Sequence, residues 1–436
     1  MGNIAQSTKN KYEDKGFRGI GRLGGLGYCE KLTFETSFFG ENVKSTMVWD
    51  AKRLKEIFDD GSIQIGAAEL ISMIIEYSYS EAKEDEHYFR VTMENVNEAS
   101  EILLDVQKVT EYLSMVAPVP FENTFTFKNQ IYEKAKEKSV PIDEYNVYVN
   151  TDKLYKGYKD AILNDKGSEK DEIKEIVFFE EEYDNQPLFW GWCGITVEMQ
   201  QIPEVNKERL IRLRKSNIQI GLENRLNEFY KDPAEGNLYF VGEVYALNKE
   251  LIPNGRRDFF IDNEECTQFS RKLKEVFKKL HSIYYDFSTK NAAIKDSQKL
   301  EDNKELIKDK TLNEQDKRKV TAEIERLEKK VTKAQTSIPK ILNKYKDTNT
   351  EIFNVLNDSI KESGFDFTPQ QDNTTFVKAT PSKPQVTTPT KTAVLTQTVS
   401  VPEKNILDKV FSILRKNLIN STAEELIKKI EEEFAK

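Results

Sequence analysis

Residues 15–27 read KGFRGIGRLGGLG, and the interpretation of the whole chain starts from them. Six glycines fall within twelve residues, while Ile20, Leu23 and Leu26 keep the spacing of a helix that packs on a neighbour. Glycine lets the backbone approach a ligand closely, and free N–H groups at the start of a helix bind anions, most often phosphate. The stretch therefore predicts a phosphate-binding loop. The alternative is a flexible connector, which would not usually carry the apolar spacing.

The residues upstream make this interpretation more specific. Residues 3–9 read NIAQSTK, and the Gly-x-x-Gly-x-Gly pattern follows after a short spacer. This arrangement resembles the lid and second glycine box of the GHKL ATPases, which include gyrase, the ninety-kilodalton heat-shock chaperones, histidine kinases and MutL. The heat-shock (HtpG-like) chaperones are nearest, and in them this segment closes over ATP. By this resemblance the nucleotide contacts are Ser7, Thr8, Lys9, Gly16, Arg18, Gly19, Ile20 and Gly21.

Two other parts of the family's nucleotide site precede this segment. They are a helix carrying Glu and Asn and an Asp-x-Gly-x-Gly loop, whereas the first acidic residues here, Glu13 and Asp14, lie in the spacer. The resemblance implies ATP with magnesium as the cofactor, with no magnesium ligand in this chain. We expect a shortened form, a pocket supplied by another chain, or a protein that does not turn over ATP. It would be an ATPase only if the missing pocket is supplied.

A second motif lies at residues 251–260, LIPNGRRDFF. It resembles the middle-domain loop of the heat-shock chaperones, in which Leu-Pro-Leu-Asn is followed after two residues by Arg-Glu. Asn254 and Arg257 take the family positions, and Asp258 replaces the acid. The resemblance makes Arg257 the catalytic residue, because a guanidinium at a γ-phosphate stabilises charge that develops during phosphoryl transfer. The alternative is a loop with a solvated arginine pair. Weaker candidates for the same role, or for binding acidic partners, are Arg212, Arg214 and Lys215.

Composition bounds the class of protein. The 436 residues carry a net charge of -9 and are 32% charged, which predicts a soluble chain of two or three domains. The acidic balance argues against a dedicated nucleic-acid binder and leaves room for a local basic patch. No run is apolar enough to span a membrane, and the opening residues are too polar for a signal peptide. The three cysteines have neither zinc-site nor disulfide spacing, which predicts a cytoplasmic protein with Cys29 and Cys193 as buried small hydrophobes.

The predicted fold class is α/β (α+β), beginning with a partial Bergerat-type nucleotide-lid layer. Residues 1–121 form this partial GHKL nucleotide-binding domain, with strands predicted at 32–36, 45–49 and 87–93 by their alternation. Apolar spacing predicts a helix over 103–113, which the prolines at 118 and 120 end.

Residues 122–288 are predicted to be a middle or transducer α/β domain. The expected strands are 146–150, 175–181, 188–199, 210–213 and 238–246. The aromatic run at 189–192, FWGW, predicts a core strand with one close-packed glycine. A base-stacking platform is the alternative for this run.

The last third of the chain is predicted to be helical and to associate with partners. One apolar helical face begins after Asn263, and residues 289–364 are predicted to form a helical hairpin or coiled coil with a break near 311–313. A single solvated helix is the alternative, and 338–360 should pack back on the body. Residues 365–403 have the composition of a disordered Thr/Pro-rich linker. Residues 404–436, with a capping box at Ser421, predict a helical module for dimerisation or hetero-assembly.

The resemblance implies an ATP-dependent conformational switch or chaperone acting on a protein client or assembly. One alternative is a non-catalytic interaction scaffold derived from a GHKL ATPase. Another is a MutL-like, ATP-gated clamp on DNA, with the arginine cluster around Arg212 on phosphates; the acidic charge balance disfavours nucleic acid as the partner.

Overall fold

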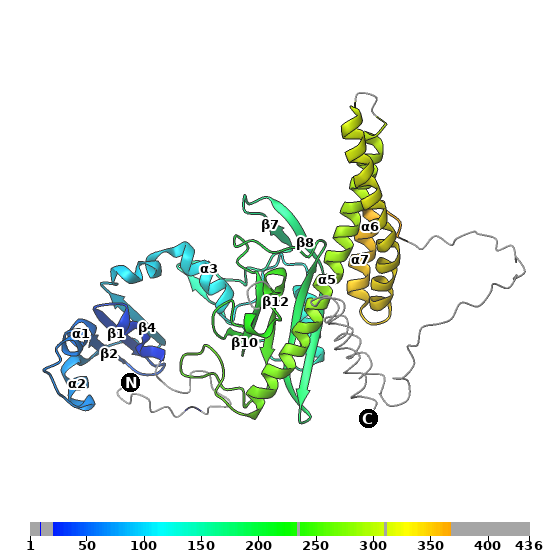
Figure 1. Ribbon diagram of the computed structural model, residues 1–436. Coiled ribbons are helices and arrows are strands. Elements are labelled where there is room, and N and C mark those ends of the chain that lie inside the picture. Colours follow the sequence, from blue (N-terminus) through cyan, green and yellow to red (C-terminus); the bar gives the residue numbers. More distant parts are fainter. Residues whose placement is uncertain (1–8, 10–20, 233–235, 309–311, 368–436) are drawn as a thin grey trace, which may run out of the picture. The chain divides into compact units, whose positions relative to one another are not determined.

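The computed structural model describes residues 9, 21–232, 236–308 and 312–367, all within the first of two compact units, Met1–Gln370 and Gln371–Lys436 (Figure 1). It contains both helices and sheets, so the predicted mixed α/β class is confirmed. The predicted contacts Ser7, Thr8, Gly16, Arg18, Gly19 and Ile20 lie outside the described residues, as do the linker from 368 onward and the 404–436 module.

The first layer is a four-stranded antiparallel sheet in the order β3-β2-β1-β4. The three strands predicted from alternation are present, and β1 turns into β2 around Gly40, whose φ is +87°. The edge strand β3 was not predicted, although Ile75, Tyr77 and Tyr79 alternate with polar residues along it, and almost all of it is exposed. The bounds are β1 Lys31–Ser37, β2 Val43–Asp50, β3 Ile75–Glu81 and β4 Tyr88–Glu94.

Three short helices cover one face of this sheet. They are the 3-10 helix η1 (Gly21–Gly27), α1 (Ala51–Asp59) and α2 (Ala67–Ile74). Leu23 and Leu26 of η1 pack against a core that includes Leu32 and Trp49, so the predicted packing of the glycine-rich segment is confirmed for these residues. Their three-residue spacing suits a 3-10 helix, which repeats every three residues.

A helical segment leads from this layer to the second sheet. The single helix predicted over 103–113 is two elements, the 3-10 helix η2 (Glu98–Leu104) and α3 (Val106–Val116). The boundary has a local cause: the side chain of Asp105 accepts a hydrogen bond from the backbone N–H of Lys108 and so caps α3. The helix ends before Pro118, as predicted.

The second sheet has six strands in the order β11-β10-β12-β9-β8-β7. Neighbouring strands are antiparallel except β10 and β12, which are parallel. The long strands were predicted, and the short β5 falls within the strand expected at 146–150, whereas β6, β7 and β11 were not predicted. The bounds are β7 Ala161–Leu163, β8 Glu169–Tyr183, β9 Gln186–Thr196, β10 Leu210–Lys215, β11 Ile218–Gln219 and β12 Val241–Ala246; a separate hairpin pairs β5 Tyr148–Val149 with β6 Asp152–Lys153.

Two glycines allow the central strands of this sheet to pack closely. A Cβ atom on Gly191 would lie 2.5 Å from the ring of Phe179, and one on Gly242 would lie 2.2 Å from the carbonyl oxygen of Trp192. The run at 189–192 is therefore a core strand with a close-packed glycine, as predicted. Its tryptophans are 2% and 0% exposed, so they are not a base-stacking platform at the surface.

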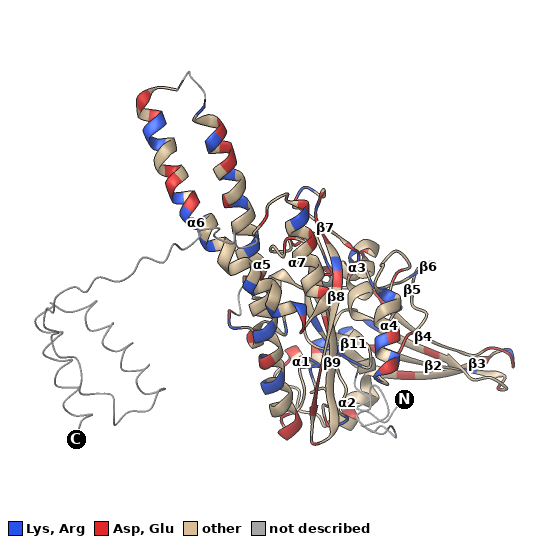
Figure 2. Ribbon diagram, turned by 90° about the vertical axis from the view of Figure 1, so that its right-hand side faces the viewer, with Lys and Arg blue, Asp and Glu red and all other residues tan. Residues whose placement is uncertain are grey.

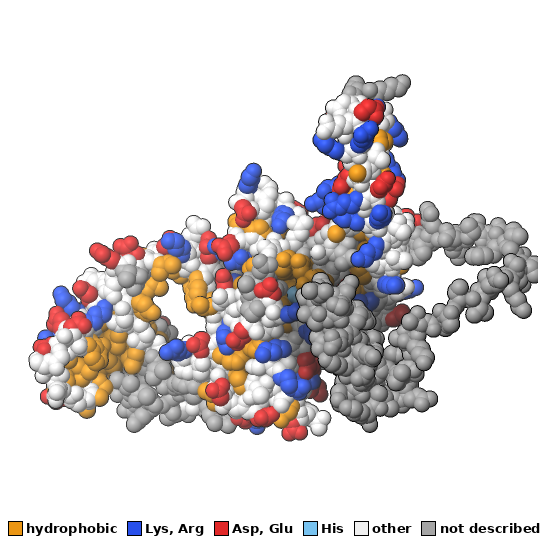
Figure 3. All heavy atoms as spheres, viewed as in Figure 1, with side chains coloured by type: hydrophobic (Ala, Val, Ile, Leu, Met, Phe, Trp, Pro, Cys, Tyr) orange, Lys and Arg blue, Asp and Glu red, His pale blue; other side chains and the backbone are white. Residues whose placement is uncertain are grey.

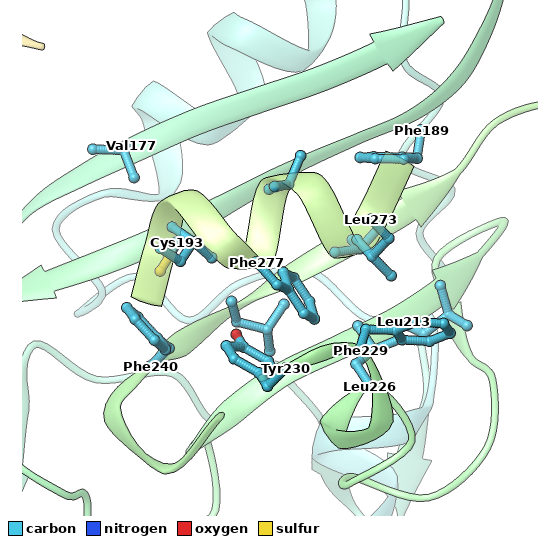
Figure 4. Packing of buried hydrophobic residues seen from close by; sticks show 14 of the residues in the cluster. Val177, Phe189, Cys193, Leu213, Leu226, Phe229, Tyr230, Phe240, Leu273 and Phe277 are labelled. Atoms are coloured by element: carbon cyan, nitrogen blue, oxygen red, sulfur yellow. The ribbon is translucent and has the colours of Figure 1, made fainter. Parts of the chain in front are cut away.

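Helices α5 (Glu264–Leu306) and α7 (Thr350–Glu362) pack against one face of the six-stranded sheet. The apolar face predicted for α5 is buried here, with Phe269 against Phe189 and Phe277 stacked on Tyr230 at a ring-centroid distance of 4.2 Å. Figure 4 shows Phe277 of α5 pointing toward Tyr230. Two 3-10 helices, η3 (Asn227–Phe229) and η4 (Gly236–Tyr239), precede β12, which therefore starts three residues later than predicted.

The opposite face of the sheet carries an aromatic cluster and α4 (Lys128–Glu137). Phe121, Phe125 and Tyr158 surround the indole of Trp192 at ring-centroid distances of 6.0, 5.9 and 5.2 Å. The same face also buries charged groups, which are described with the candidate site.

Helix α5 pairs with α6 (Glu314–Lys346) and forms a helical hairpin with it. The boundary expected at 288/289 falls inside α5, which continues without a break because its buried positions run from Cys266 to Leu300. α7 then returns to β8 and β9, as predicted for 338–360. Phe365 and Phe367 belong to the hydrophobic cluster at the base of the hairpin, although the sequence analysis placed them in the linker.

Replacing Gly242 by Ala should lower the free energy of unfolding by about 2 kcal/mol or more, because the new methyl group overlaps backbone that cannot retreat. Urea unfolding of the full chain measures the change. Gly61→Ala is the matched control, since nothing lies within 4 Å of its Cβ position. Equal midpoints for the two variants would contradict the close packing of β12 on β9.

Candidate functional site

The loop that carries Arg257 is a closed turn between β12 and α5. A β-bridge joins Pro253 to Phe260, and the backbone N–H of Arg257 donates to the carbonyl of Asn254 at 3.1 Å. Asn254 Nδ2 also donates to Asp258 Oδ1 at 2.6 Å. Arg257 has a φ of 55°, in the left-handed region, and its side chain is partly exposed. The turn holds the two positions that resemble the chaperone loop, Asn254 and Arg257, in one rigid unit.

This loop is attached to the six-stranded domain at Gly221. The N–H of Gly221 donates to the carbonyl of Arg257 at 2.8 Å. Gly221 has a φ of +70°, and a Cβ atom there would lie 2.7 Å from the carbonyl oxygen of Asp258, so only glycine fits. Arg225 adds a cation–π contact, its guanidinium carbon 4.2 Å from the ring centre of Phe259.

A cleft of about 420 Å³ opens beside Gly221. One wall is α3, which contributes Lys108, Tyr112 and Met115. The other wall includes Arg212 of β10 and Gln219 of β11. The cleft therefore lies where the helix from the first layer meets the sheet that anchors the Arg257 loop.

Arg212 is the most deeply buried cation of this cleft, with a side chain 3% exposed. Its Nη1 donates to Gln219 Oε1 at 3.0 Å, Nη2 donates to the carbonyl of Lys207, and Glu223 Oε2 lies 3.6 Å away. Its Nε–H has no hydrogen-bond partner among the residues that the structure describes. Burial, which disfavours the charged form, lowers the pKa of the guanidinium. An incompletely satisfied buried cation at a cleft is suited to receive an anion.

Behind the cleft, the buried carboxylate of Glu243 accepts hydrogen bonds from several buried side chains. Glu243 of β12 lies in register with Arg212 and is fully buried. Lys156 Nζ donates to its Oε2 at 2.8 Å, and the hydroxyl of Tyr158 donates to Oε1 at 3.0 Å. Arg214 and Tyr245 also donate to this carboxylate.

The charges in this cluster set one another's ionisation. Burial raises the pKa of Glu243, but Arg214 and Lys156 oppose it more strongly and bring the pKa to about 2. Burial lowers the pKa of Lys156, with Arg214 acting in the same direction and Glu243 against it. Glu243 is therefore a carboxylate at neutral pH, and its role is to neutralise buried cations.

The cluster also anchors α3. Arg214 Nη2 donates to the carbonyl of Met115, in the last turn of that helix, at 2.7 Å. Arg214 Nη1 donates to the carbonyl of Asn217, whose side chain in turn donates to the carbonyl of Asp143. The carboxyl end of α3 is thus held by a guanidinium fixed in the core of the second domain.

Two of the weaker sequence candidates, Arg214 and Lys215, have structural roles instead. Arg214 is fully buried against Glu243, and Lys215 donates to the carbonyls of Leu247 and Asn248. The expectation that they reach a phosphate or an acidic partner is wrong for Arg214. Alternate residues of a strand face the same side of the sheet, so Arg212 and Arg214 of β10 face the side that carries Glu243. The sequence did contain a signal for this pairing: Glu243 is an acidic residue within the otherwise apolar strand GEVYA at 242–246.

Of the predicted nucleotide contacts, the structure describes two. Lys9 is exposed, and Gly21 begins η1. All three cysteines are buried and free, which confirms the prediction for Cys29 and Cys193. Within the described ranges, no three His, Cys, Asp or Glu side chains are grouped as a metal site would require. None of the helices in these ranges combines the length and apolar composition needed to cross a membrane.

Comparison with known proteins adds no relative: no protein-family model matches this chain, and no curated protein matches it significantly.

Replacing Glu243 by Gln should lower the free energy of unfolding by about 3–5 kcal/mol, because Lys156 and Arg214 would stay buried without a countercharge. The urea midpoint of the full chain reports this loss.

Glu172→Gln is the control for that substitution, since Glu172 pairs with Lys174 on an exposed part of β8 and should contribute less than about 1 kcal/mol. If both variants unfold at the wild-type urea concentration, the cluster is not what holds the sheet together.

Proposed function

We propose that this chain belongs to an ATP-dependent conformational switch of the GHKL type, similar to the ninety-kilodalton heat-shock chaperones, that acts on a protein client or assembly. The observation that carries the proposal is the position of the Arg257 loop. It is attached to Gly221, a residue that lines a cleft together with the buried cation Arg212. The loop that resembles the chaperone loop in sequence therefore lies next to a cleft that contains a buried positive charge, and phosphate groups bind at positive charges.

On this proposal the glycine-rich segment holds the phosphates of ATP. Backbone N–H groups at Gly16, Gly19 and Gly21 would contact them, and Lys9 and Arg18 would supply charge. The packing of Leu23 and Leu26 supports this, because it fixes the downstream end of the segment to the sheet. Arg257 would reach the γ-phosphate and stabilise the charge of phosphoryl transfer.

Magnesium would enter with the nucleotide. Mg²⁺ keeps several waters and is usually bound through substrate phosphates and one or two carboxylates, so a protein cage of three ligands is not required.

The conformational part of the proposal rests on α3. This helix leads from the first sheet to the second, and Arg214 holds its last turn through Met115. Its side chains line the same cleft as Arg212. A ligand that closes the cleft would therefore pull on the connection between the two sheets, which is the coupling a switch needs.

A non-catalytic scaffold is the second candidate, and the first sheet favours it. Tyr79 of β3 and Phe89 of β4 are 73% and 55% exposed. Figure 3 shows hydrophobic side chains gathered on this layer. Exposed apolar surface of this kind marks interaction sites. Support for a DNA clamp through the arginine cluster is weaker, because Arg212 and Arg214 are buried.

The decisive experiment is calorimetric titration of the 436-residue chain with ATP and magnesium, followed by turnover measurement. Arg257→Ala should leave binding measurable and lower turnover by about a thousandfold or more, as loss of a transition-state arginine does. Arg256→Ala is the matched control on the same turn, because Arg256 is more exposed and precedes the family position.

Two results would overturn this assignment. Undiminished turnover in Arg257→Ala would remove Arg257 from the reaction. No heat of binding and no turnover in the wild-type chain would leave the interaction scaffold as the function.

A further inference from the structure

Helix α6 has an uneven charge distribution. All five of its acidic residues lie between Glu314 and Glu328, whereas its second half, from Lys329 to Lys346, carries six lysines and no carboxylate. The whole chain has a net charge of -9, so this half-helix departs strongly from its surroundings. Figure 2 shows that the acidic residues of α6 lie toward the far end of the hairpin.

Several of the basic residues lie on one outer face of α6. The buried positions Leu327, Ala334 and Ile338 point toward α5 and the body. At 100° per residue, Lys329, Lys333 and Lys340 lie on the far side of the helix and Arg326 lies at the edge of that side, and all four are exposed. We call these four residues the α6 basic stripe. It spans about 21 Å at 1.5 Å per residue. One acidic residue, Glu325, is exposed on the same side.

The stripe is separate from the lysines that hold the hairpin together. Lys330 pairs with Asp296 at 3.0 Å, and Lys344 pairs with Asp286 at 2.6 Å, so these two are used in contacts with α5. Among the described residues, Lys329, Lys333 and Lys340 have no carboxylate within 4.0 Å. Arg326 contacts Glu323 and is 67% exposed. Figure 3 shows Lys and Arg side chains gathered on the lower part of the hairpin.

We propose that the α6 basic stripe binds the phosphate backbone of double-stranded nucleic acid. A row of basic side chains along one helix face is the electrostatic footprint of such binding, and its length corresponds to about six steps of 3.4 Å along one strand. Asn343 lies beside the stripe and is exposed, and its side-chain amide can donate to phosphate oxygens. This function is independent of ATP binding and of Arg257.

The composition of the stripe distinguishes the partner. A protein partner needs buried aromatic or aliphatic anchors at the centre of its interface, and the stripe has none. Single-stranded nucleic acid is held by bases stacked on aromatic side chains, which are also missing from this face. A row of basic side chains without apolar anchors or aromatic rings is suited to the regularly spaced phosphates of a duplex.

The test measures binding of the full chain to a fluorescein-labelled DNA duplex of mixed sequence, longer than the stripe, by fluorescence anisotropy without nucleotide. The variant is Lys329→Gln/Lys333→Gln/Lys340→Gln. We expect about a tenfold or greater loss of affinity and a slope of log K against log salt that is less steep by about three between about 50 and 200 mM salt, roughly one for each lysine that no longer neutralises a phosphate.

The control variant, Lys52→Gln/Lys136→Gln/Lys166→Gln, makes the same change of net charge at exposed lysines away from the hairpin. It should bind the duplex as the wild type does. Equal loss in both variants, or binding of polyglutamate with none of the duplex, would overturn the proposal, the second result indicating an acidic protein partner. Circular dichroism of each variant confirms that the helices are retained.

Discussion

The neutralisation of Glu243 in the core of the six-stranded sheet is the interaction on which the rest of the structure depends. Parallel pairing of β10 with β12 brings two arginines to the same face as this acid. Arg214 and Lys156 are both fully buried, and an uncompensated charge there would cost several kcal/mol. Glu243 therefore stabilises the aromatic layer through its hydrogen bond from Tyr158, and the end of α3 is held through Arg214.

The same principle sorts the cations of the chain into two groups. In the first group, cations bind carboxylates of other elements and are structural: Arg214 in the core, and Lys330 and Lys344 along the hairpin. Arg212 retains an unsatisfied Nε–H beside a cleft, and the α6 basic stripe faces outward. The proposals for nucleotide and for nucleic acid both rest on this second group. They concern separate surfaces, and each can hold without the other.

Much of the fold could be predicted because its long elements have one buried side. β1 and β2 alternate, β9 is a continuous apolar run, and α5 keeps an apolar face over many turns, so these strands and the helical hairpin could be predicted from sequence pattern. β11 has only two residues and therefore no pattern to detect. β3 does alternate apolar and polar residues, so its sequence carried a strand signal that was missed. The apolar spacing over 103–113 predicted one helix. The structure has two, because Asp105 caps the start of α3 and interrupts the predicted helix.

The sequence by itself determined which segments alternate, where helices continue, that the cysteines are buried and that α6 turns basic after Glu328, because each is a property of neighbouring residues. Only the tertiary structure decided what the arginines do. Arg214 and Glu243 are 29 residues apart in sequence, and nothing local to either places them on one face. Strand order and register do so, because they bring distant segments into contact and leave one guanidinium neutralised in the core and another at the cleft.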